Sequence, residues 1–256
     1  MKKIFAIAAV AAMLIACGEP EENKPQGGNN NGGTEQPEPE VPEFKAAITV
    51  DGNFADWEGL EVDELALEEG EEYSKAELKK VKFYTDEMYI NIYAEYDPAN
   101  AMALCIYLDV DADATTGRAE PCQGIELYLD GTIAEWSLNE AGDTFIAPRI
   151  SALAPDCAVH KFTGEDGTAG WDWETDILGA GNGFAVGCTP VPVGANEAFE
   201  MAIVKELCPI ALGEEVGIAV SITGYDWAEH GTLPQYSVAE TEAGAEGRAA
   251  CHVVAL

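Results

Sequence analysis

Positive charge is scarce in this sequence. Its 256 residues include 13 lysines and arginines against 47 aspartates and glutamates, a formal net charge of −34. Proteins bind phosphate backbones through Lys and Arg, so this balance argues against a nucleic-acid partner.

Catalytic motifs are missing as well. The three histidines, His160, His230 and His252, have no HExxH spacing, and the sequence contains no GxSxG elbow and no phosphate-binding glycine loop. We therefore expect that the protein is not an enzyme. A glycosidase is the enzymatic alternative, because the separation of two carboxylates in space cannot be read from a sequence.

The seven cysteines show no paired CxxC spacing of the kind that holds zinc. If Cys17 is consumed by lipid, as argued below, an even number remains, and an exported domain could form up to three disulfides among them. The alternative is that several are small buried side chains. The six are Cys105, Cys122, Cys157, Cys188, Cys208 and Cys251.

The N-terminus has the pattern of an export signal. Lys2 and Lys3 precede a short apolar run, 4–15, which is typical of a signal peptide over residues 1–16. The segment Leu14-Ile15-Ala16-Cys17 resembles the lipobox of bacterial lipoproteins, which implies cleavage before Cys17 and its lipidation. The acids that follow, at 19, 21 and 22, resemble the export signal of Bacteroidetes surface lipoproteins. We expect a lipid-anchored protein at the outer membrane or cell surface.

Residues 17–43 are rich in Gly, Asn, Pro and Glu and poor in apolar side chains. A segment that cannot bury apolar surface is expected to stay a disordered tether. Residues 44–256 instead carry many short apolar runs with period-two alternation, separated by turn residues. This pattern predicts a single all-β domain, a two-sheet antiparallel β-sandwich with short helical turns.

Particular elements follow from the same pattern. The runs 81–83 and 88–96 around Thr85-Asp86-Glu87 predict a hairpin, and Asp130-Gly131 predicts a second one. The segments 60–66 and 74–80 are the arguable helical turns.

The strand predicted over 103–108 leads into an acidic loop. Leu104, Ile106 and Leu108 should share one face of this strand, with Cys105 and Tyr107 on the other.

Beyond this strand, Asp109, Asp111, Asp113 and Glu120 occupy the first, third, fifth and twelfth positions of a calcium-loop spacing, which predicts a structural Ca²⁺ site. Ala114 replaces the glycine expected at the sixth position, and the flanks read as strands, so the loop is not an EF-hand. The alternative is a solvated loop whose carboxylates cap backbone groups.

The tryptophans are candidates for ligand contacts. Trp57 is expected in the core. Trp171 and Trp173, two apart on one strand face, form either a core layer or a binding platform. Trp227 lies in a polar loop beside Tyr225 and Asp226, and these three are the leading ligand-contact candidates.

Several of these pieces together resemble family 9 carbohydrate-binding modules and the related DOMON-like domains. The pieces span residues 48–236 in the family's order, and the insert at 187–196 departs from it. They are Val50 to Trp57 with its Asp-Gly and Asp-Trp pairs, the hairpin Phe83 to Tyr96, the Asp-x-Asp loop from Leu108 to Thr116-Gly117, the strands Phe199 to Ile203 and Gly217 to Val220, and Pro234.

The resemblance implies a β-sandwich, frequent metal binding, and sugar ends held between aromatic rings. We therefore expect a surface-anchored, non-catalytic carbohydrate-binding module. Its partner would be a glycan, with the membrane reached only through the lipid anchor. The alternative from another class is an interaction or scaffold lipoprotein that uses the same fold to hold a surface protein.

Overall fold

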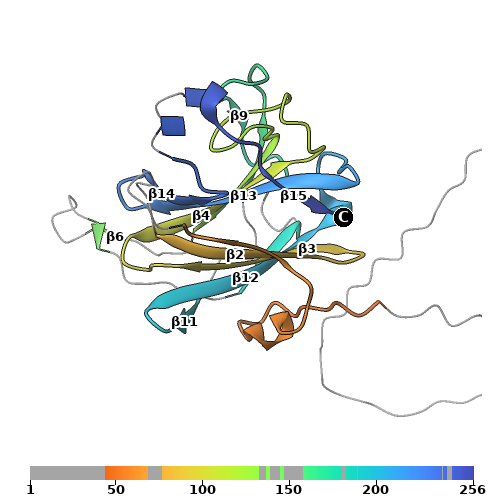
Figure 1. The fold of residues 1–256 in the computed structure, drawn as a ribbon, viewed down its shortest axis with the longest axis vertical. Helices are drawn as coiled ribbons and strands as arrows, with labels where there is room; N and C mark the ends of the chain where they lie inside the picture. The colour runs from red at the N-terminus through yellow and green to blue at the C-terminus, as the bar shows by residue number, and fades with distance from the viewer. Residues whose placement is uncertain are drawn as a thin grey trace, which may run out of the picture. The chain divides into compact units, whose positions relative to one another are not determined.

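Two antiparallel β-sheets face each other within residues 44–256 (Figure 1). The structure is a computed structural model. It describes residues 44–68, 77–132, 137–138, 145–146, 158–179, 183–188, 190–237, 239–240 and 244–256. Residues Phe44–Leu256 form one unit, separate from Met1–Glu43. No helix among the described residues is long and apolar enough to cross a membrane.

The first sheet, here called sheet A, has the strand order β1-β2-β3-β12-β10, with β11 also paired to β12. Its strands are β1 (Asp63–Ala66), β2 (Leu78–Thr85), β3 (Tyr89–Tyr96), β10 (Ala185–Gly187), β11 (Val191–Val193) and β12 (Asn196–Val204).

The second sheet, sheet B, has the order β14-β13-β4-β5-β8-β9, with β15 also paired to β13. Its strands are β4 (Ala101–Asp109), β5 (Leu127–Thr132), β8 (Ala158–Phe162), β9 (Trp173–Glu174), β13 (Glu215–Gly224), β14 (Glu229–Leu233) and β15 (His252–Ala255). The short strands β6 (Ser137–Leu138) and β7 (Phe145–Ile146) pair with each other.

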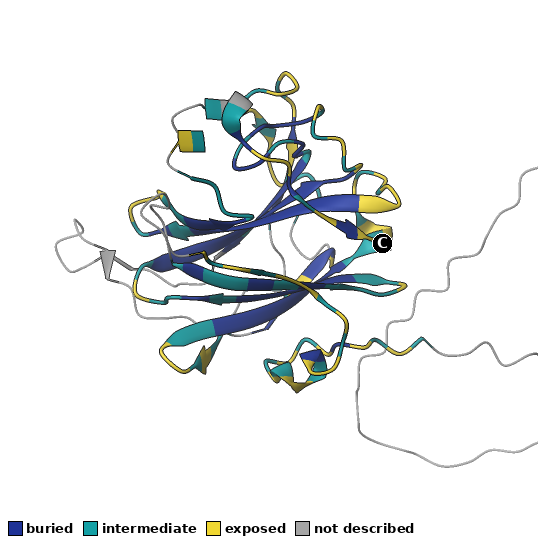
Figure 2. Cartoon of the chain, viewed as in Figure 1, coloured by how far each residue is buried: buried dark blue, intermediate teal, exposed yellow. Residues whose placement is uncertain are grey.

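The main core lies between the sheets and is built by strand alternation (Figure 2). As predicted, Leu104, Ile106 and Leu108 of β4 are buried in it, while Cys105 and Tyr107 belong to a separate cluster on the other face. Burial of apolar side chains at about 25 cal/mol per Å² is the dominant stabilising term in such a sandwich.

The hairpin around Asp86 is confirmed, because β2 and β3 pair antiparallel and the Asp86 carboxylate accepts hydrogen bonds from the Met88 and Tyr89 amides. The prediction of a hairpin at Asp130-Gly131 is wrong. Both residues lie inside β5, opposite β4, because pairing with two neighbouring strands outweighs the local turn preference.

The predicted helical turns are also wrong. Residues 63–66 form β1, and residues 78–80 begin β2, with the first part of the 74–80 segment outside the described residues. Short helical turns do occur, as the 3-10 helices η1 (Phe54–Trp57), η2 (Lys205–Leu207) and η3 (Gly244–Gly247). The segments 60–66 and 74–80 are too short for apolar periodicity to separate a strand from a helix.

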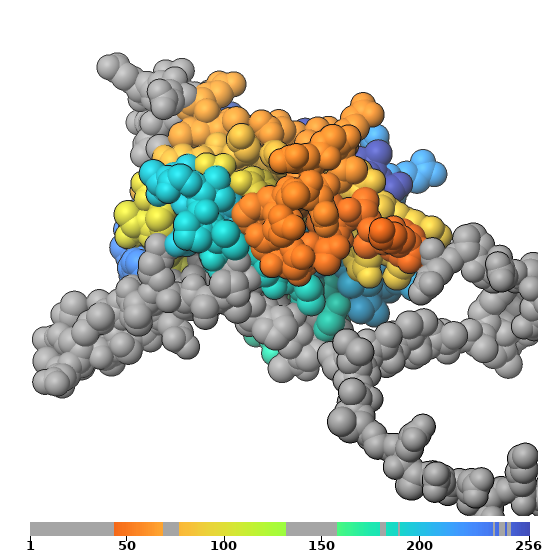
Figure 3. Space-filling model, turned by 90° about the horizontal axis from the view of Figure 1, so that it is seen from below, coloured from red at the N-terminus to blue at the C-terminus, as the bar shows by residue number. Residues whose placement is uncertain are grey.

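The outer face of sheet A is covered by the segment that precedes β1, coloured orange in Figure 3. Ile48 and Trp57 are buried there against Tyr93 and Ala198. Trp57 is only 4% exposed, as expected of a core residue.

The outer face of sheet B carries a second core under loops. Its buried members come from β4, β5 and β13 and from the residues just before β5 and β15; they are Cys105, Tyr107, Cys122, Ile125, Tyr128, Ala219 and Cys251. Cys122 and Cys251 form a disulfide across it. Cys105, Cys188 and Cys208 are free thiols, and Cys157 lies outside the described residues.

Candidate functional site

A pocket of about 170 Å³ opens on the outer face of sheet B, beside the second core. Its floor is formed by Tyr107 of β4 and by Ser221 and Thr223 of β13. These strands are neighbours in the sheet, and alternation turns the three side chains away from the main core. The floor therefore presents hydroxyl groups.

Two tryptophans line the pocket from loops. Trp171, two residues before β9, is 63% exposed, and Trp227, in the turn between β13 and β14, is 64% exposed. The Trp171 ring is in contact with the Arg118 guanidinium, 5.1 Å from its centre, and with the Tyr128 ring at 5.6 Å. Large exposed rings at a pocket make it the candidate ligand site.

Trp227 has a left-handed backbone with φ of 63°. This conformation is unfavourable for a bulky L-residue. The turn is closed by hydrogen bonds from the Trp227 amide to the Gly224 carbonyl and from the Gly224 amide to the Ala228 carbonyl. The backbone is therefore strained at Trp227, the residue whose indole ring is exposed at the pocket.

The remaining ligand-contact candidates lie elsewhere. Trp173 packs edge-on against Phe162 and at a tilt against Tyr128, so it supports the second core while Trp171 lines the pocket. Tyr225 and Asp226 precede Trp227 but are not among the described residues that line the pocket.

Asp226 has a structural role beside the pocket. Its carboxylate accepts a hydrogen bond from the Ala228 amide and lies 2.8 Å from Nε2 of His230, whose Nδ1 is 3.1 Å from Glu77. Burial lowers the pKa of His230, but the hydrogen bonds and charges of Glu77 and Asp226 outweigh burial and the pKa is raised. This network ties the Trp227 turn to the start of β2.

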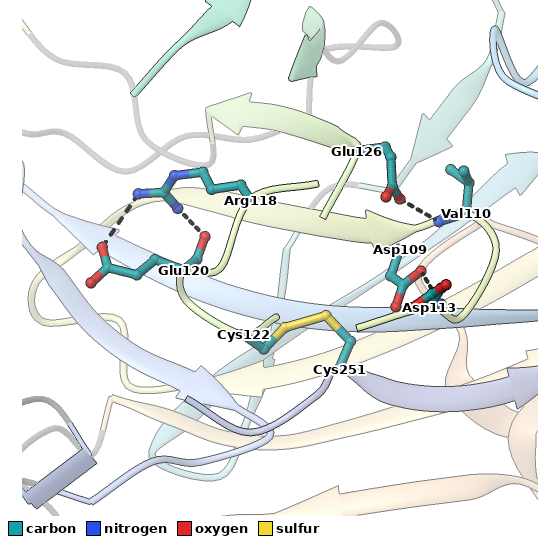
Figure 4. Close-up of a disulfide and its surroundings, with 8 residues drawn as sticks. All are labelled: Asp109, Val110, Asp113, Arg118, Glu120, Cys122, Glu126 and Cys251. Carbon is teal, nitrogen blue, oxygen red and sulfur yellow. Dashed lines mark hydrogen bonds and ion pairs between the residues drawn. A yellow bond between two sulfur atoms is a disulfide. The ribbon is translucent and has the colours of Figure 1, made fainter. Parts of the chain in front are cut away.

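Two arginines and a glutamate, Arg118, Arg248 and Glu120, contribute to the polar rim of the pocket. Figure 4 shows the Arg118–Glu120 pair. Arg118 donates from Nε to the Gly170 carbonyl at 3.0 Å and from Nη2 to the Ala169 carbonyl at 3.2 Å. The Glu120 carboxylate lies 3.4 Å from Nη2 of Arg118 and 3.7 Å from Nη2 of Arg248. The rim is a chain of paired charges that was not anticipated from the sequence.

Glu120 therefore does not join the acidic loop, contrary to the sequence-based placement. Its carboxylate lies at the arginine pair, because the chain turns after Gly117 and continues as a β-bridge between Arg118 and Ile125. Assigning ligands by their positions in the sequence assumes the backbone of a calcium loop, and the backbone here has a different course.

The acidic loop brings a different set of carboxylates together. Oxygens of Asp109, Asp111 and Glu126 lie within 4.8 Å of one another, from the end of β4, the loop and the residue before β5. Glu126 was missed by spacing, although its neighbour Leu127 pairs with Leu108 and places it beside the end of β4. A cross-strand argument would have found it.

Asp109 is 2% exposed, and burial together with the charges of Glu126 and Asp111 raises its pKa to about 7. Its Oδ1 accepts a hydrogen bond from the Asp113 amide at 3.2 Å, and Asp111 accepts one from the same amide at 3.1 Å. Asp113 itself accepts from the Thr115 amide and hydroxyl. The described loop thus combines backbone capping with three clustered carboxylates that fit a hard cation.

Comparisons with known proteins return little. No family model matches the chain, and no curated protein matches it. Among solved structures it is similar to a family 9 carbohydrate-binding module from Caldicellulosiruptor kristjanssonii, in complex with cellotriose. The similarity has 12% identity and a TM-score of 0.36, and covers 73% of this chain and 78% of that one. At this level of similarity, a ligand has to be inferred from the pocket itself.

Proposed function

We propose that this domain is a non-catalytic carbohydrate-binding module whose ligand enters between Trp171 and Trp227. The observation that carries the proposal is the pairing of two rings, 63% and 64% exposed, with a hydroxyl-bearing floor in one pocket. A sugar presents C–H faces that stack on aromatic rings and hydroxyls that bond to polar groups. A site for this ligand needs both kinds of surface.

Size and charge narrow the ligand. At about 170 Å³ the pocket is smaller than the ~300–1,000 Å³ typical of drug-sized ligands, which favours a single sugar unit. Its lining contains two arginines and two glutamates, Arg118, Arg248, Glu120 and Glu229, whose formal charges cancel. Because the whole chain carries −34, we expect neutral sugars to bind better than uronates.

We further propose that a structural cation occupies the acidic loop, held by Asp109, Asp111 and Glu126. When bound, Ca²⁺ would neutralise three carboxylates that otherwise repel one another. These residues lie at the end of β4, in the loop that follows and just before β5, so the ion would link the adjoining ends of two central strands of sheet B.

The domain is proposed to act at a cell surface. The basis is the lipobox-like Leu14-Ile15-Ala16-Cys17 and the low-complexity stretch that follows it. Replacing Cys17 with Ala should move the protein from the detergent phase to the aqueous phase in a detergent phase partition. An unchanged distribution would contradict the anchor.

A glycan array tests the carbohydrate proposal. We expect Trp227→Asn to weaken binding about 10- to 100-fold, because truncating an aromatic anchor typically costs about 2 kcal/mol or more. The same change should leave the melting temperature equal or higher, since Asn tolerates the left-handed backbone at this position. Trp171→Ala should weaken binding similarly. Leu207→Ala, another exposed apolar residue but outside the pocket, is the matched control.

Other outcomes would favour the alternatives. No binding on plant, host and microbial glycans, with a protein partner recovered by pull-down, would support an interaction lipoprotein. Sugar release on prolonged incubation would support a hydrolase. Binding that survives both tryptophan changes would place the ligand elsewhere on the surface.

A further inference from the structure

The Cys122–Cys251 disulfide joins the two chain segments that form the polar rim of the pocket. One segment, 118–122, carries Arg118, Glu120 and Pro121, and the other, 248–251, carries Arg248. Figure 4 shows the disulfide close to the Arg118–Glu120 pair. The two half-cystines are two and three residues from the ionic contact between Glu120 and Arg248.

These segments are also joined by weaker contacts. The Gln123 amide donates to the Ala249 carbonyl at 2.9 Å, Gln123 forms a parallel bridge with Ala250, and the Arg248–Glu120 pair is 3.7 Å long. Individual contacts of these kinds are weak in comparison with a covalent bond. The covalent bond is the strongest constraint between them.

The disulfide lies outside the main core. Cys122 and Cys251 belong to the second core on the outer face of sheet B, whereas the main core is made by residues from both sheets. The strand after Cys251, β15, is held separately, since His252 to Ala255 pair with β13. Strand pairing and the main core therefore stabilise the two sheets independently of the disulfide.

From this placement we infer that Cys122–Cys251 is a clamp for the ligand pocket. It sets the distance between the Arg118–Pro121 segment and Arg248. Its reduction opens the rim, while the strands of both sheets stay paired and the sheets stay packed on each other. An external dithiol supplies the two electrons and two protons that convert the bond to two thiols, and is itself oxidised to a cyclic disulfide. The importance of the clamp for binding rests on the proposed function, but its mechanical role does not.

Hydrogen exchange measured by mass spectrometry tests the clamp without any ligand. The samples are the oxidised wild type, the wild type reduced with dithiothreitol, and the Cys122→Ser/Cys251→Ser double variant. Peptides covering 117–126 and 247–251 should exchange at least tenfold faster after either change. Peptides from the β3–β12 pair should change less than twofold. Cys208→Ser, which removes a free thiol, is the matched control and should match the oxidised wild type.

Two results would overturn the inference. Equal protection of 117–126 in the oxidised and disulfide-free proteins would show that the weaker contacts suffice. Simultaneous loss of protection in the rim and in β3–β12, in both the reduced wild type and the variant, would make the disulfide a global stabiliser. A failure on the glycan array would leave these exchange results unaffected, so the two proposals fail separately.

Discussion

Replacing Glu200 with alanine is expected to lower the free energy of unfolding by about 3–5 kcal/mol, because three N–H donors lose a charged acceptor and hydrogen bonds to charged groups contribute about 1.5–3 kcal/mol each. Glu200 lies in β12 and is 0% exposed. Its Oε1 accepts hydrogen bonds from the Asp51 and Gly52 amides at 2.9 and 2.8 Å, and its Oε2 accepts one from Trp57 Nε1 at 2.8 Å. Alanine leaves these donors without their acceptor on the outer face of sheet A.

Urea unfolding measures this loss, and a second variant isolates the charge. Glu200→Gln keeps the size but turns an NH₂ group toward an N–H donor, so we expect roughly 2–3 kcal/mol. Glu58→Ala, an exposed acid next to the same segment, should change stability by less than about 0.5 kcal/mol. If Glu200→Ala fell within 1 kcal/mol of the wild type, the carboxylate would not be what fixes the N-terminal segment.

Saturating calcium should raise the free energy of unfolding by about 2.7 kcal/mol when its free concentration is a hundred times the dissociation constant. The reason is mass action on the cluster of Asp109, Asp111 and Glu126, whose oxygens lie within 4.8 Å of one another. Without an ion these carboxylates repel, and the raised pKa of Asp109 reflects its burial beside the other two.

Thermal melts in calcium, magnesium and chelator should show a calcium-selective shift. Asp111→Asn and Glu126→Gln should remove most of it, because each deletes one carboxylate of the cluster. Asp113→Asn and Glu120→Gln are the controls and should retain it, since Asp113 caps Thr115 and Glu120 lies at the arginines. Equal shifts with calcium and magnesium in every variant would indicate screening by salt and no site.

The sheets could be predicted from the sequence because alternation has a single period and burial enforces it. Leu104, Ile106 and Leu108 point into the main core, as their spacing required. The Asp130-Gly131 turn failed for the opposite reason, since two neighbouring strands supply β5 with more hydrogen bonds than a local turn would. The turn preference of a dipeptide is outweighed where its strand is hydrogen-bonded on both sides.

The candidate site was only partly predictable. Trp227 was singled out by its residue type and loop context, and Trp171 as one of two tryptophans on a predicted strand face; both line the pocket. Arg118 and Arg248 were missed because they are 130 positions apart in sequence and are brought together by Glu120 and the adjacent disulfide. Glu120 was predicted in the carboxylate cluster, but Glu126 takes that position. The reason is similar, because the spacing of acids along a loop carries no information on which strands pair.

The chain enters the sandwich on the face opposite the pocket. Phe44, the first described residue, contacts Tyr89 on the outer side of sheet A, while Trp171 and Trp227 lie on the outer side of sheet B. Stacked sheets are about 10 Å apart, so the whole thickness of the sandwich separates Phe44 from the mouth of the pocket. If the chain is held at a cell surface through the residues before Phe44, as proposed above, the attachment leaves the domain from the face opposite the pocket. A force applied to a bound ligand would then pass through both sheets before it reached the attachment.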